Sequence, residues 1–374
     1  MTGSLPNQLK VPPYMTLFLV HGMQIGVGIL GFTRYIAEVA GYQAWMAVLL
    51  AGGANQLIIW MIFKTIHKAD NGDLYQISKR LFGKWLGGLL MLLFSCYFAV
   101  LAIVVLRTYI EIVQVWIYPE LTTWSIALIF LLVSYYALLK GFRVIAGLTF
   151  LFVVFPLLLW PTVIPVLEYA EWFHLTPVFN TTLREQLLAA FYLTLSFAGA
   201  ELLLIYYPFL MKSKRNQLYA HLGSGATTLT YLMIALVTFL YYSPEQLERT
   251  IWPTLSAWKI VSFTFMERIE YICIALWLVV IFPNIVLSIW GASRLLKQQL
   301  KVSQRKTVVW ILVAVFLATI QFETRESINL LNTSINYIGP FFIFGLIPFL
   351  WLCSFFLKSK GGSAHGKNNQ KQSH

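Results

Sequence analysis

Three glycines with the spacing GxGxxG, Gly26, Gly28 and Gly31, lie inside an apolar stretch that runs from residue 12 to residue 37. Glycine tolerates the non-helical dihedrals that interrupt a helix. The N–H groups freed at the start of the next half-helix carry partial positive charge and attract a carboxylate. In a membrane, unwound backbone must line a cavity or be buried in protein. The spacing therefore favours an interrupted helix that binds a ligand.

The glycine spacing has two other interpretations. Small residues let two membrane helices approach closely, so the glycines also fit a helix-packing face. A dinucleotide-binding loop has the same spacing, but it requires a preceding strand and a βαβ unit. The apolar residues before Gly26 indicate neither. We therefore expect no dinucleotide, while helix packing stays open beside the interrupted helix.

A second apolar stretch contains a matching weak point. FAGAE, residues 197 to 201, places Gly199 about as deep in its stretch as Gly26 lies in the first. A carboxylate at the membrane centre costs about 2.5–3.5 kcal/mol on insertion scales, so Glu201 should face the protein interior with a partner. Two roles follow for Glu201: it holds a proton or the amine of a ligand, or it bridges helices as a structural group.

These features predict a binding site between the two interruptions. The backbone of residues 26 to 29 is expected to receive a ligand carboxylate, residues 197 to 199 form the facing wall, and Glu201 orients polar groups. Side chains from two further stretches are expected to contribute specificity. The candidate binding residues are Gln24, Gly26, Val27, Gly28, Ile29, Gly31, Tyr97, Leu101, Val104, Phe197, Ala198, Gly199, Glu201, Trp277 and Ile281.

Opposite charges four residues apart occur twice near the ends of apolar stretches, as Arg34 with Glu38 and Arg107 with Glu111. Residues at this spacing share a helix face and support each other. The pairs fit either interfacial salt bridges or an outer gate.

The composition indicates an integral membrane protein. The chain is 59% hydrophobic and only 11% charged, whereas a typical soluble domain has about 25% charged residues. A membrane-spanning helix needs about 20 mostly apolar residues. Ten stretches fit this role, near residues 12–37, 42–64, 85–113, 123–139, 144–167, 186–211, 219–242, 268–291, 307–322 and 334–357. We therefore predict an all-α protein with ten transmembrane helices.

The distribution of basic residues predicts the topology. When the ten predicted spans alternate across the membrane, most of the 27 Lys and Arg residues fall on the side of the N-terminus. This is the positive-inside pattern, which predicts that both termini are cytoplasmic. It also makes the lipid bilayer, and not nucleic acid, the partner that the net charge of +12 implies. The basic segment 361–374 is expected to be a disordered tail.

Ten spans divide into two halves of five, and an odd number per half makes the second half enter from the opposite side. In such inverted repeats the first helix of each half is often interrupted near the midplane. Gly26 and Gly199 lie at the matching positions. We predict a single transmembrane domain, residues 1–360, with one repeat at about 12–167 and the other at about 186–357.

The sequence gives no sign of catalysis. No nucleophile stands with a base, and no cluster of metal-ligating residues is present, so we expect neither enzyme activity nor a metal or cofactor. Ion coupling is not indicated either. The predicted span five has no lysine before Glu168, and span eight offers Asn284 and Ser288 without the adjacent hydroxyl pair that a sodium site would need.

The pattern resembles the amino acid, polyamine and organocation (APC) transporter superfamily, whose first span carries GxGxxG and whose sixth carries FxGxE. Residues 250–282, TIWPTLSAWKIVSFTFMERIEYICIALWLVVIF, are similar to the WPT...ER.E signature of the permease-like B subunits of bacterial spore germinant receptors. YPFLMKSKR (207–215) and FGKWLG (82–87) fit the same family. The resemblance covers essentially the full chain.

The resemblance implies a leucine-transporter (LeuT) fold with broken helices one and six. It also implies a nutrient sensor in the inner membrane of the dormant spore that works with an A subunit and a lipoprotein C subunit. A small nutrient, an amino acid or a sugar, would bind near the midplane and trigger germination. A proton- or sodium-coupled amino-acid transporter of the plasma membrane is the alternative. A channel component is disfavoured, because no predicted span has a regular polar stripe.

Overall fold

The computed structural model describes residues 6–177, 180–261 and 268–357. One isolated β-bridge joins Val11 to Leu210, and the other described elements are helices. The all-α class is therefore as predicted. The predicted tail, residues 361–374, and part of the 250–282 signature lie outside the described residues.

Sixteen α-helices make up most of the described chain. They are α1 (Met15–Gln24), α2 (Phe32–Ala40), α3 (Trp45–Lys68), α4 (Leu74–Trp116), α5 (Thr123–Leu139), α6 (Phe142–Val154), α7 (Ile164–Leu167), α8 (Leu183–Tyr192), α9 (Leu203–Tyr206), α10 (Arg215–Tyr241), α11 (Pro244–Arg249), α12 (Pro253–Ala257), α13 (Ile269–Leu300), α14 (Gln304–Gln321), α15 (Arg325–Pro340) and α16 (Ile347–Cys353).

Short helices of other types connect or interrupt them. The 3-10 helices are η1 (Asn7–Leu9), η2 (Val27–Leu30), η3 (Gly41–Ala44), η4 (Phe155–Val163), η5 (Trp172–Leu175), η6 (Thr194–Phe197), η7 (Ala200–Leu202), η8 (Tyr207–Phe209), η9 (Trp258–Ile260) and η11 (Ser354–Phe356). A π-helix, η10 (Phe341–Leu346), follows α15 directly.

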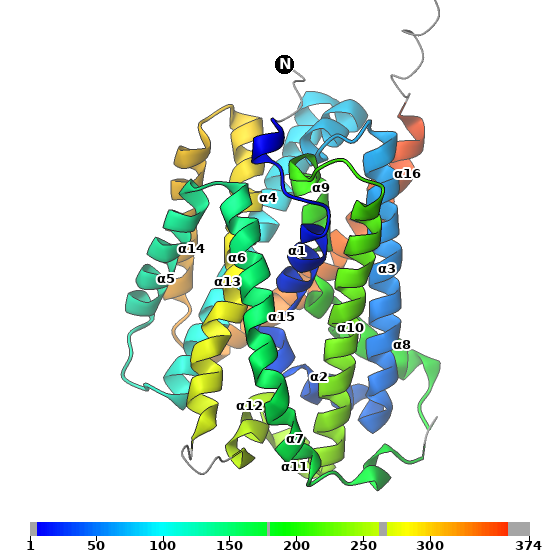
Figure 1. The fold of residues 1–374 in the computed structure, drawn as a ribbon, viewed down its shortest axis with the longest axis vertical. Helices are drawn as coiled ribbons and strands as arrows, with labels where there is room; N and C mark the ends of the chain where they lie inside the picture. Colours follow the sequence, from blue (N-terminus) through cyan, green and yellow to red (C-terminus); the bar gives the residue numbers. More distant parts are fainter. Residues whose placement is uncertain (1–5, 178–179, 262–267, 358–374) are drawn as a thin grey trace, which may run out of the picture.

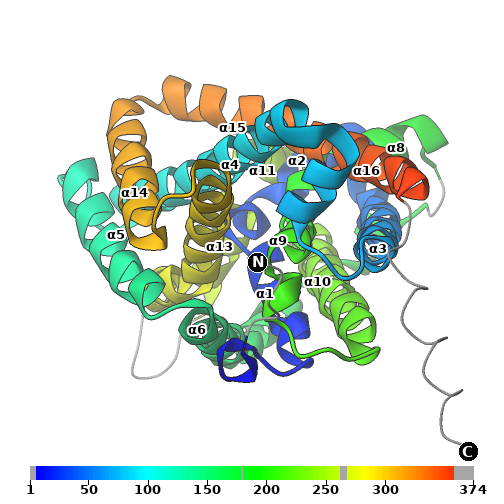
Figure 2. The same ribbon diagram turned by 90° about the horizontal axis from the view of Figure 1, so that it is seen from above.

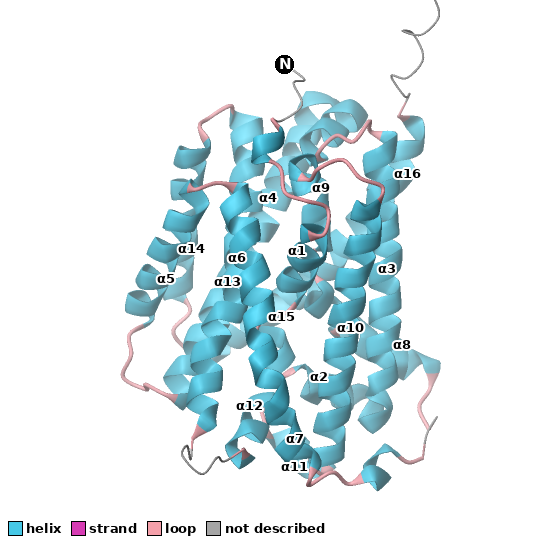
Figure 3. Cartoon of the chain, in the orientation of Figure 1, coloured by secondary structure: helices cyan, strands magenta, loops and turns pink. Residues whose placement is uncertain are grey.

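The long helices run roughly along one axis of the molecule (Figures 1 and 3). Viewed along that axis, α1 and α9 lie near the centre with longer helices around them (Figure 2). α13 packs along α4, and α1 packs against both α6 and α10. Helices from the two halves of the chain therefore interleave in one bundle.

The described residues contain seven helices that are long and apolar enough to cross a membrane, or eight when the bent pair Leu183–Tyr192 and Thr194–Phe209 is taken as one span. This is a multi-span membrane protein. Two of the ten predicted stretches account for most of the difference. The first is divided between α1, which has only 10 residues, and α2, which runs on into α3. The fourth, α5, has 17 residues.

Two of the predicted helices were too short. α4 begins at Leu74 and not at residue 85, because the Asp73 side chain caps it by accepting a hydrogen bond of 3.1 Å from the N–H of Gln76. Its chain then bends at Gly83, where φ is 71°. α13 continues to Leu300, nine residues beyond the predicted end. Polar residues extend these helices past their apolar parts, and a hydrophobicity criterion misses such extensions.

The first of the two predicted interruptions lies at Gly26. α1 ends at Gln24, Ile25 is extended, and Gly26 has φ −138° and ψ −150°. The backbone then makes one 3-10 turn, η2, before α2 begins. The chain therefore leaves the α-helical path for several residues, as expected from the glycine spacing.

The second interruption lies between α8 and α9. The chain bends by 55° after Tyr192, passes through η6, and reaches Gly199 with φ 111°. Residues other than glycine rarely adopt this dihedral. A Cβ atom at Gly199 would also lie 2.0 Å from Cγ of Met23. Glycine is thus required here both for the backbone conformation and for the close approach of α1.

Candidate ligand-binding site

A cavity of about 180 Å³ lies where the two interruptions meet. We call it the central cavity. Residues of the first break form one side, the η6 segment forms another, and α4 and α15 close it from the opposite direction. Its lining comprises Met23, Gln24, Gly26, Val27, Gly28, Gly31, Phe32, Tyr35, Leu101, Val104, Val105, Thr108, Tyr192, Leu195, Ser196, Ala198, Tyr231, Trp252, Asn284, Asn332, Ile335 and Asn336.

A side-chain amide joins the two broken helices. Gln24 Nε2 donates a 3.0 Å hydrogen bond to the carbonyl oxygen of Phe197. The hydroxyl of Tyr231, on α10, donates to the carbonyl oxygen of Gln24 at 3.2 Å. Carbonyl groups freed where each helix ends thus receive side-chain donors. This satisfies backbone groups that would otherwise be costly inside a membrane protein.

Asn284, on α13, holds the end of α1 in the same way. Its Nδ2 donates to the carbonyl oxygens of Gly22, at 3.0 Å, and Met23, at 2.7 Å. Because both partners are acceptors, the amide nitrogen must face them, and Oδ1 therefore points away. That oxygen is buried without a hydrogen-bond partner among the described residues. It would lie 3.0 Å from a Cβ atom at Gly26.

The same argument applies to Gln24. Its nitrogen faces the carbonyl of Phe197, and its buried Oε1 has no partner among the described residues. Both side chains line the central cavity. Buried polar atoms without partners are rare in native proteins. The two amide oxygens are therefore available to accept hydrogen bonds from a ligand.

The segment after α11 packs against the first break. Thr254 Oγ1, on α12, donates to the carbonyl oxygen of Ile29 at 3.1 Å. The ring of Trp252 lies so close to Gly31 that a Cβ atom there would come within 3.1 Å of it. Trp277 Nε1, on α13, donates to the carbonyl oxygen of Gly26 at 3.3 Å. Three elements thus hold the broken segment.

The wall opposite the break comes from α4 and α15. α4 contributes Leu101, Val104 and Thr108, and α15 contributes Asn332 and Asn336. These two asparagines are four residues apart and share one helix face. Thr108 Oγ1 donates to Asn332 Oδ1 at 3.2 Å. This wall therefore offers amide and hydroxyl groups beside aliphatic side chains.

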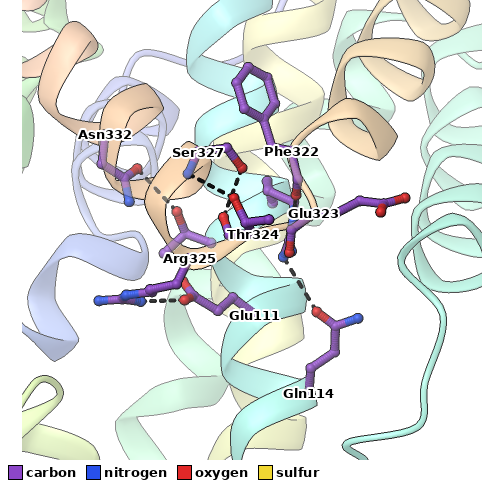
Figure 4. Close-up of polar contacts among 10 residues, drawn as sticks. Glu111, Gln114, Phe322, Glu323, Thr324, Arg325, Ser327 and Asn332 are labelled. Atoms are coloured by element: carbon purple, nitrogen blue, oxygen red, sulfur yellow. Dashed lines mark hydrogen bonds and ion pairs between the residues drawn. The ribbon is translucent and has the colours of Figure 1, made fainter.

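A partly buried ionic cluster fixes α15 to α4 beside this wall (Figure 4). Glu111 forms an ion pair with Arg325, at the start of α15. The buried guanidinium of Arg107 donates to the carbonyl oxygens of Phe322 and Glu323, in the loop before α15. The four-residue spacing predicts that Arg107 and Glu111 support each other along α4. In the structure, both also bind residues outside α4: Arg107 binds the loop before α15, and Glu111 binds the start of α15.

The lining of the central cavity contains no Asp, Glu, Lys, Arg or His side chain. A ligand with a net charge would find no counter-ion there, and an unpaired charge out of water is costly. The polar groups present are amides, hydroxyls, an indole and backbone. The cavity is thus suited to a small molecule without net charge that donates several hydrogen bonds.

Eight of the residues predicted for the site line the central cavity. They are Gln24, Gly26, Val27, Gly28, Gly31, Leu101, Val104 and Ala198. Seven others do not line it. They are Ile29, Tyr97, Phe197, Gly199, Glu201, Trp277 and Ile281. Phe197 still contributes its carbonyl to the contact with Gln24, whereas Ile29 and Trp277 face a second cavity on the other side of the break.

Glu201 is hydrogen-bonded within the protein and does not line the central cavity. Its carboxylate is fully buried and accepts hydrogen bonds from the hydroxyl of Tyr97 at 2.8 Å and from the N–H of Gly199 at 2.9 Å. The Tyr97 ring in turn stacks on Phe342 of η10, with centroids 4.2 Å apart. Glu201 therefore ties the second break to α4 and lies away from the cavity.

Sequence reasoning missed many lining residues. They are Met23, Phe32, Tyr35, Val105, Thr108, Tyr192, Leu195, Ser196, Tyr231, Trp252, Asn284, Asn332, Ile335 and Asn336. A signal existed for some of them. Asn332 and Asn336 are amides at helical spacing beside an apolar run, and Asn284 is an amide within one. These three were not proposed as ligand contacts.

Comparisons with known proteins agree with this architecture. Residues 10–328 match a family described as "Spore germination protein". The chain is 38% identical to the spore germination protein GerQB of Bacillus cereus over 93% of its own length and 96% of that protein.

Solved structures resemble the chain in fold alone. MhsT in complex with L-phenylalanine aligns with a TM-score of 0.66 at 12% identity, over 91% of this chain and 87% of that one. A Na+-coupled sialic acid symporter aligns with a TM-score of 0.66 at 11% identity, over 95% and 81% of the two chains. The fold is therefore of the LeuT transporter type, and the chain belongs to the spore germination protein family, the spore permeases.

Proposed function

We propose that this protein is the permease-like, nutrient-sensing subunit of a spore germinant receptor. In this proposal, a small nutrient, an amino acid or a sugar, binds in the central cavity and signals germination to A and C subunits in the spore inner membrane. Both termini of the chain then lie in the cytoplasm. Family membership supports this class of protein. The observation that carries the ligand site is a cavity where two broken helices meet, lined by apolar side chains and a few amides and hydroxyls but by no charged side chain.

We assign ten spans to the chain, in inverted repeats at about 12–167 and 186–357. With the bent pair taken as one span, the described residues contain eight long apolar spans. They become ten when α5 and the interrupted pair of α1 and α2 are each taken as a span of their own. The two interruptions then fall in the first span of each repeat, which is where inverted-repeat transporters place their broken helices. The direct contact from Gln24 to Phe197 supports this pairing.

The free amide oxygens define the ligand chemistry that we propose. Oε1 of Gln24 and Oδ1 of Asn284 accept hydrogen bonds, so the ligand presents an ammonium group or hydroxyls to them. Because the lining has no charged side chain, we favour a zwitterionic amino acid with an uncharged side chain, or a sugar. A carboxylate at the backbone of Gly26, Val27 and Gly28, which line the cavity, remains part of this proposal.

Signalling in this proposal depends on the distance between α15 and the first break. A ligand shifts a conformational equilibrium only through its different affinities for the two states. A nutrient that contacts both Asn284 and the amides of α15 favours the state in which these elements lie close together. The π-helix η10 follows α15, and π-helical segments often occur at functional sites. We assign η10 as the point about which α15 moves.

Gly28 offers a direct test of the ligand site. A Cβ atom there meets only Ser196 Oγ, at 3.8 Å, and Gly28 lines the cavity, so Gly28→Leu is expected to fill part of it. We expect it to weaken nutrient binding by about tenfold or more and to block germination of spores that carry it. Binding is measured with labelled neutral amino acids and glucose on the protein in nanodiscs.

Gly53→Leu is the matched control, because Gly53 is exposed on α3 and a Cβ atom there has no neighbour within 4 Å. Both variants should reach the membrane in normal amounts. Unchanged nutrient dose responses in spores that carry Gly28→Leu would reject the central cavity as the sensing site.

A coupled amino-acid transporter is the second candidate, and the fold similarity to MhsT and to a Na+-coupled symporter favours it. The chain alone in proteoliposomes decides between the two. Uptake of a labelled amino acid driven by a sodium or proton gradient supports transport. A nutrient response that appears only when two partner subunits are co-expressed supports the receptor.

A further inference from the structure

A second cavity, of about 150 Å³, lies on the opposite side of the first break from the central cavity. We call it the lateral cavity. Ile25 and Ile29 line it, whereas Gly26, Val27 and Gly28 between them line the central cavity. Its other walls come from α1, α6, η4, α7, α10, α12, η9 and α13. The proposed nutrient site makes no use of this space.

The lateral cavity opens sideways, between η4 and α10. Leu157 of η4 and Met233 of α10 both line it, and their exposed fractions are 54% and 38%. Both residues belong to apolar helices long enough to cross a membrane. In Figure 1, the helical segment that contains η4, between α6 and α7, runs beside α10 along the long axis of the molecule. The opening therefore faces the hydrocarbon of the bilayer and not water.

Most of the lining is apolar, and several of its polar groups are paired within the protein. His21 Nδ1 shares a 2.9 Å hydrogen bond with Thr227 Oγ1. Thr162 Oγ1 donates to the carbonyl oxygen of Leu159 and accepts a 3.0 Å hydrogen bond from Trp258 Nε1. Thr254 Oγ1 donates to the carbonyl oxygen of Ile29. A water molecule in a cavity needs two to four polar partners, and apolar cavities of about this size stay dry and take apolar guests.

We propose that the lateral cavity binds one acyl chain of a membrane lipid. The acyl chain enters between Leu157 and Met233, because this opening faces lipid hydrocarbon. Its end lies against Trp258 and Trp277. There the acyl chain makes dispersion contacts with lining atoms that would have no partner if the cavity were empty.

An acyl chain in this position supports the first break from behind. It contacts Ile25 and Ile29 directly, and it contacts Trp277, whose Nε1 donates to the carbonyl oxygen of Gly26. Nutrient and lipid would then bind to opposite faces of one short, unwound segment.

Photolabelling in a bilayer tests this proposal. The complete protein is placed in nanodiscs of phosphatidylcholine that carries a diazirine near the end of one acyl chain, and adducts are mapped by mass spectrometry after illumination. Trp258 and Trp277 are each only 6% exposed, so bulk lipid does not reach them. We expect adducts on both.

Filling the cavity should remove these adducts. Val237→Trp, on α10, occupies the lateral cavity and is expected to lower labelling of Trp258 and Trp277 by about tenfold or more. Leu229→Trp is its matched control, because Leu229 is 57% exposed on the same helix and does not line the cavity. A second pair comes from η4: Val163→Phe fills the cavity, and Leu158→Phe points outward.

Adducts confined to exposed residues such as Leu229 and Leu158 in the unaltered protein would overturn the proposal. Equal interior labelling in the filled and control variants would also overturn it. Interior labelling by a free diazirine alkane, with none by the lipid, would assign the cavity to small apolar molecules and reject the acyl chain. The η4 pair keeps the test decisive if Val237→Trp does not fold.

Discussion

Gln24 Nε2 and the carbonyl oxygen of Phe197 lie 3.0 Å apart, and this hydrogen bond joins the two broken helices across 173 residues of sequence. Gln24 is the last residue of α1, and Phe197 is the last residue of η6 in the second break. The arrangement makes the relative position of the two breaks depend on one side chain that also lines the central cavity. A ligand that accepts a hydrogen bond from this amide, or displaces it from the Phe197 carbonyl, therefore acts on both breaks at once.

Gln24→Leu should destabilise the protein and weaken nutrient binding. The Phe197 carbonyl loses its donor, which costs about 1–3 kcal/mol for a buried polar group, and the free Oε1 is lost from the cavity. We expect a lower thermal unfolding midpoint and about tenfold weaker binding. Gln56→Leu is the control, because Gln56 Nε2 donates to the carbonyl of His221 away from the cavity. Equal nutrient affinities in the two variants would argue against a ligand role for Gln24.

Asn336→Leu should separate binding from stability. Asn336 lines the central cavity, and no hydrogen bond of its side chain is found in the described part of the chain. Its replacement should change the free energy of unfolding by less than about 0.5 kcal/mol and reduce nutrient affinity. Asn329→Leu, on the exposed face of α15, should leave both unchanged. Titration calorimetry in nanodiscs measures the affinities, and identical values would remove α15 from the site.

Gly199→Ala should destabilise the second break strongly. The left-handed dihedral at this position costs a residue with a Cβ about 1–2 kcal/mol, and the new methyl group clashes with Met23. The double variant Gly199→Ala/Met23→Ala relieves the clash alone, so we expect it to recover part of the loss in thermal stability. Gly147→Ala is the control, since a Cβ atom there has no neighbour within 4 Å. A Gly199→Ala protein that melts like this control would mean that the break does not need glycine.

Glu111→Gln should loosen the start of α15. The charge pair with Arg325 is lost. The cap of α15, in which the N–H of Ser327 donates to Thr324 Oγ1 at 3.2 Å, remains. We expect faster hydrogen exchange of the backbone in residues 325–332, measured by mass spectrometry. Arg268→Met breaks a more exposed pair, with Glu270 on α13, and should leave α15 unchanged. If exchange in α15 is the same in both variants, the ion pair does not hold this helix.

The two breaks were predictable because their signals are local. Glycines at residues 26 and 199 interrupt stretches that are otherwise apolar, and the dihedrals of the chain follow from the residue type. Membrane character was equally clear from composition. The lengths of α4 and α13 were not, because capping by Asp73 and polar extensions fall outside a measure of hydrophobicity.

The faces of the site residues were less predictable. Glu201 looked like a ligand contact, yet its partner Tyr97 lies 104 residues earlier in the chain, and no sequence periodicity reveals which side of a broken helix faces a cavity. Trp252 reaches Gly31 from a segment between two helices, so its place in the lining depends on tertiary packing. Asn332 was missed because the predicted tenth span began two residues after it.

The elements that hold the first break differ from those that form the opposite wall. Side chains of α10, α12 and α13 donate to the backbone of residues 22–29, whereas α4 and α15 make none of the described hydrogen bonds to it. Substitutions at Leu101, Val104, Thr108 and Asn336 can therefore alter the shape of the central cavity without breaking the hydrogen bonds that hold the unwound segment. We expect a change of preferred nutrient to be obtainable on this scaffold by exchanging residues of two helices.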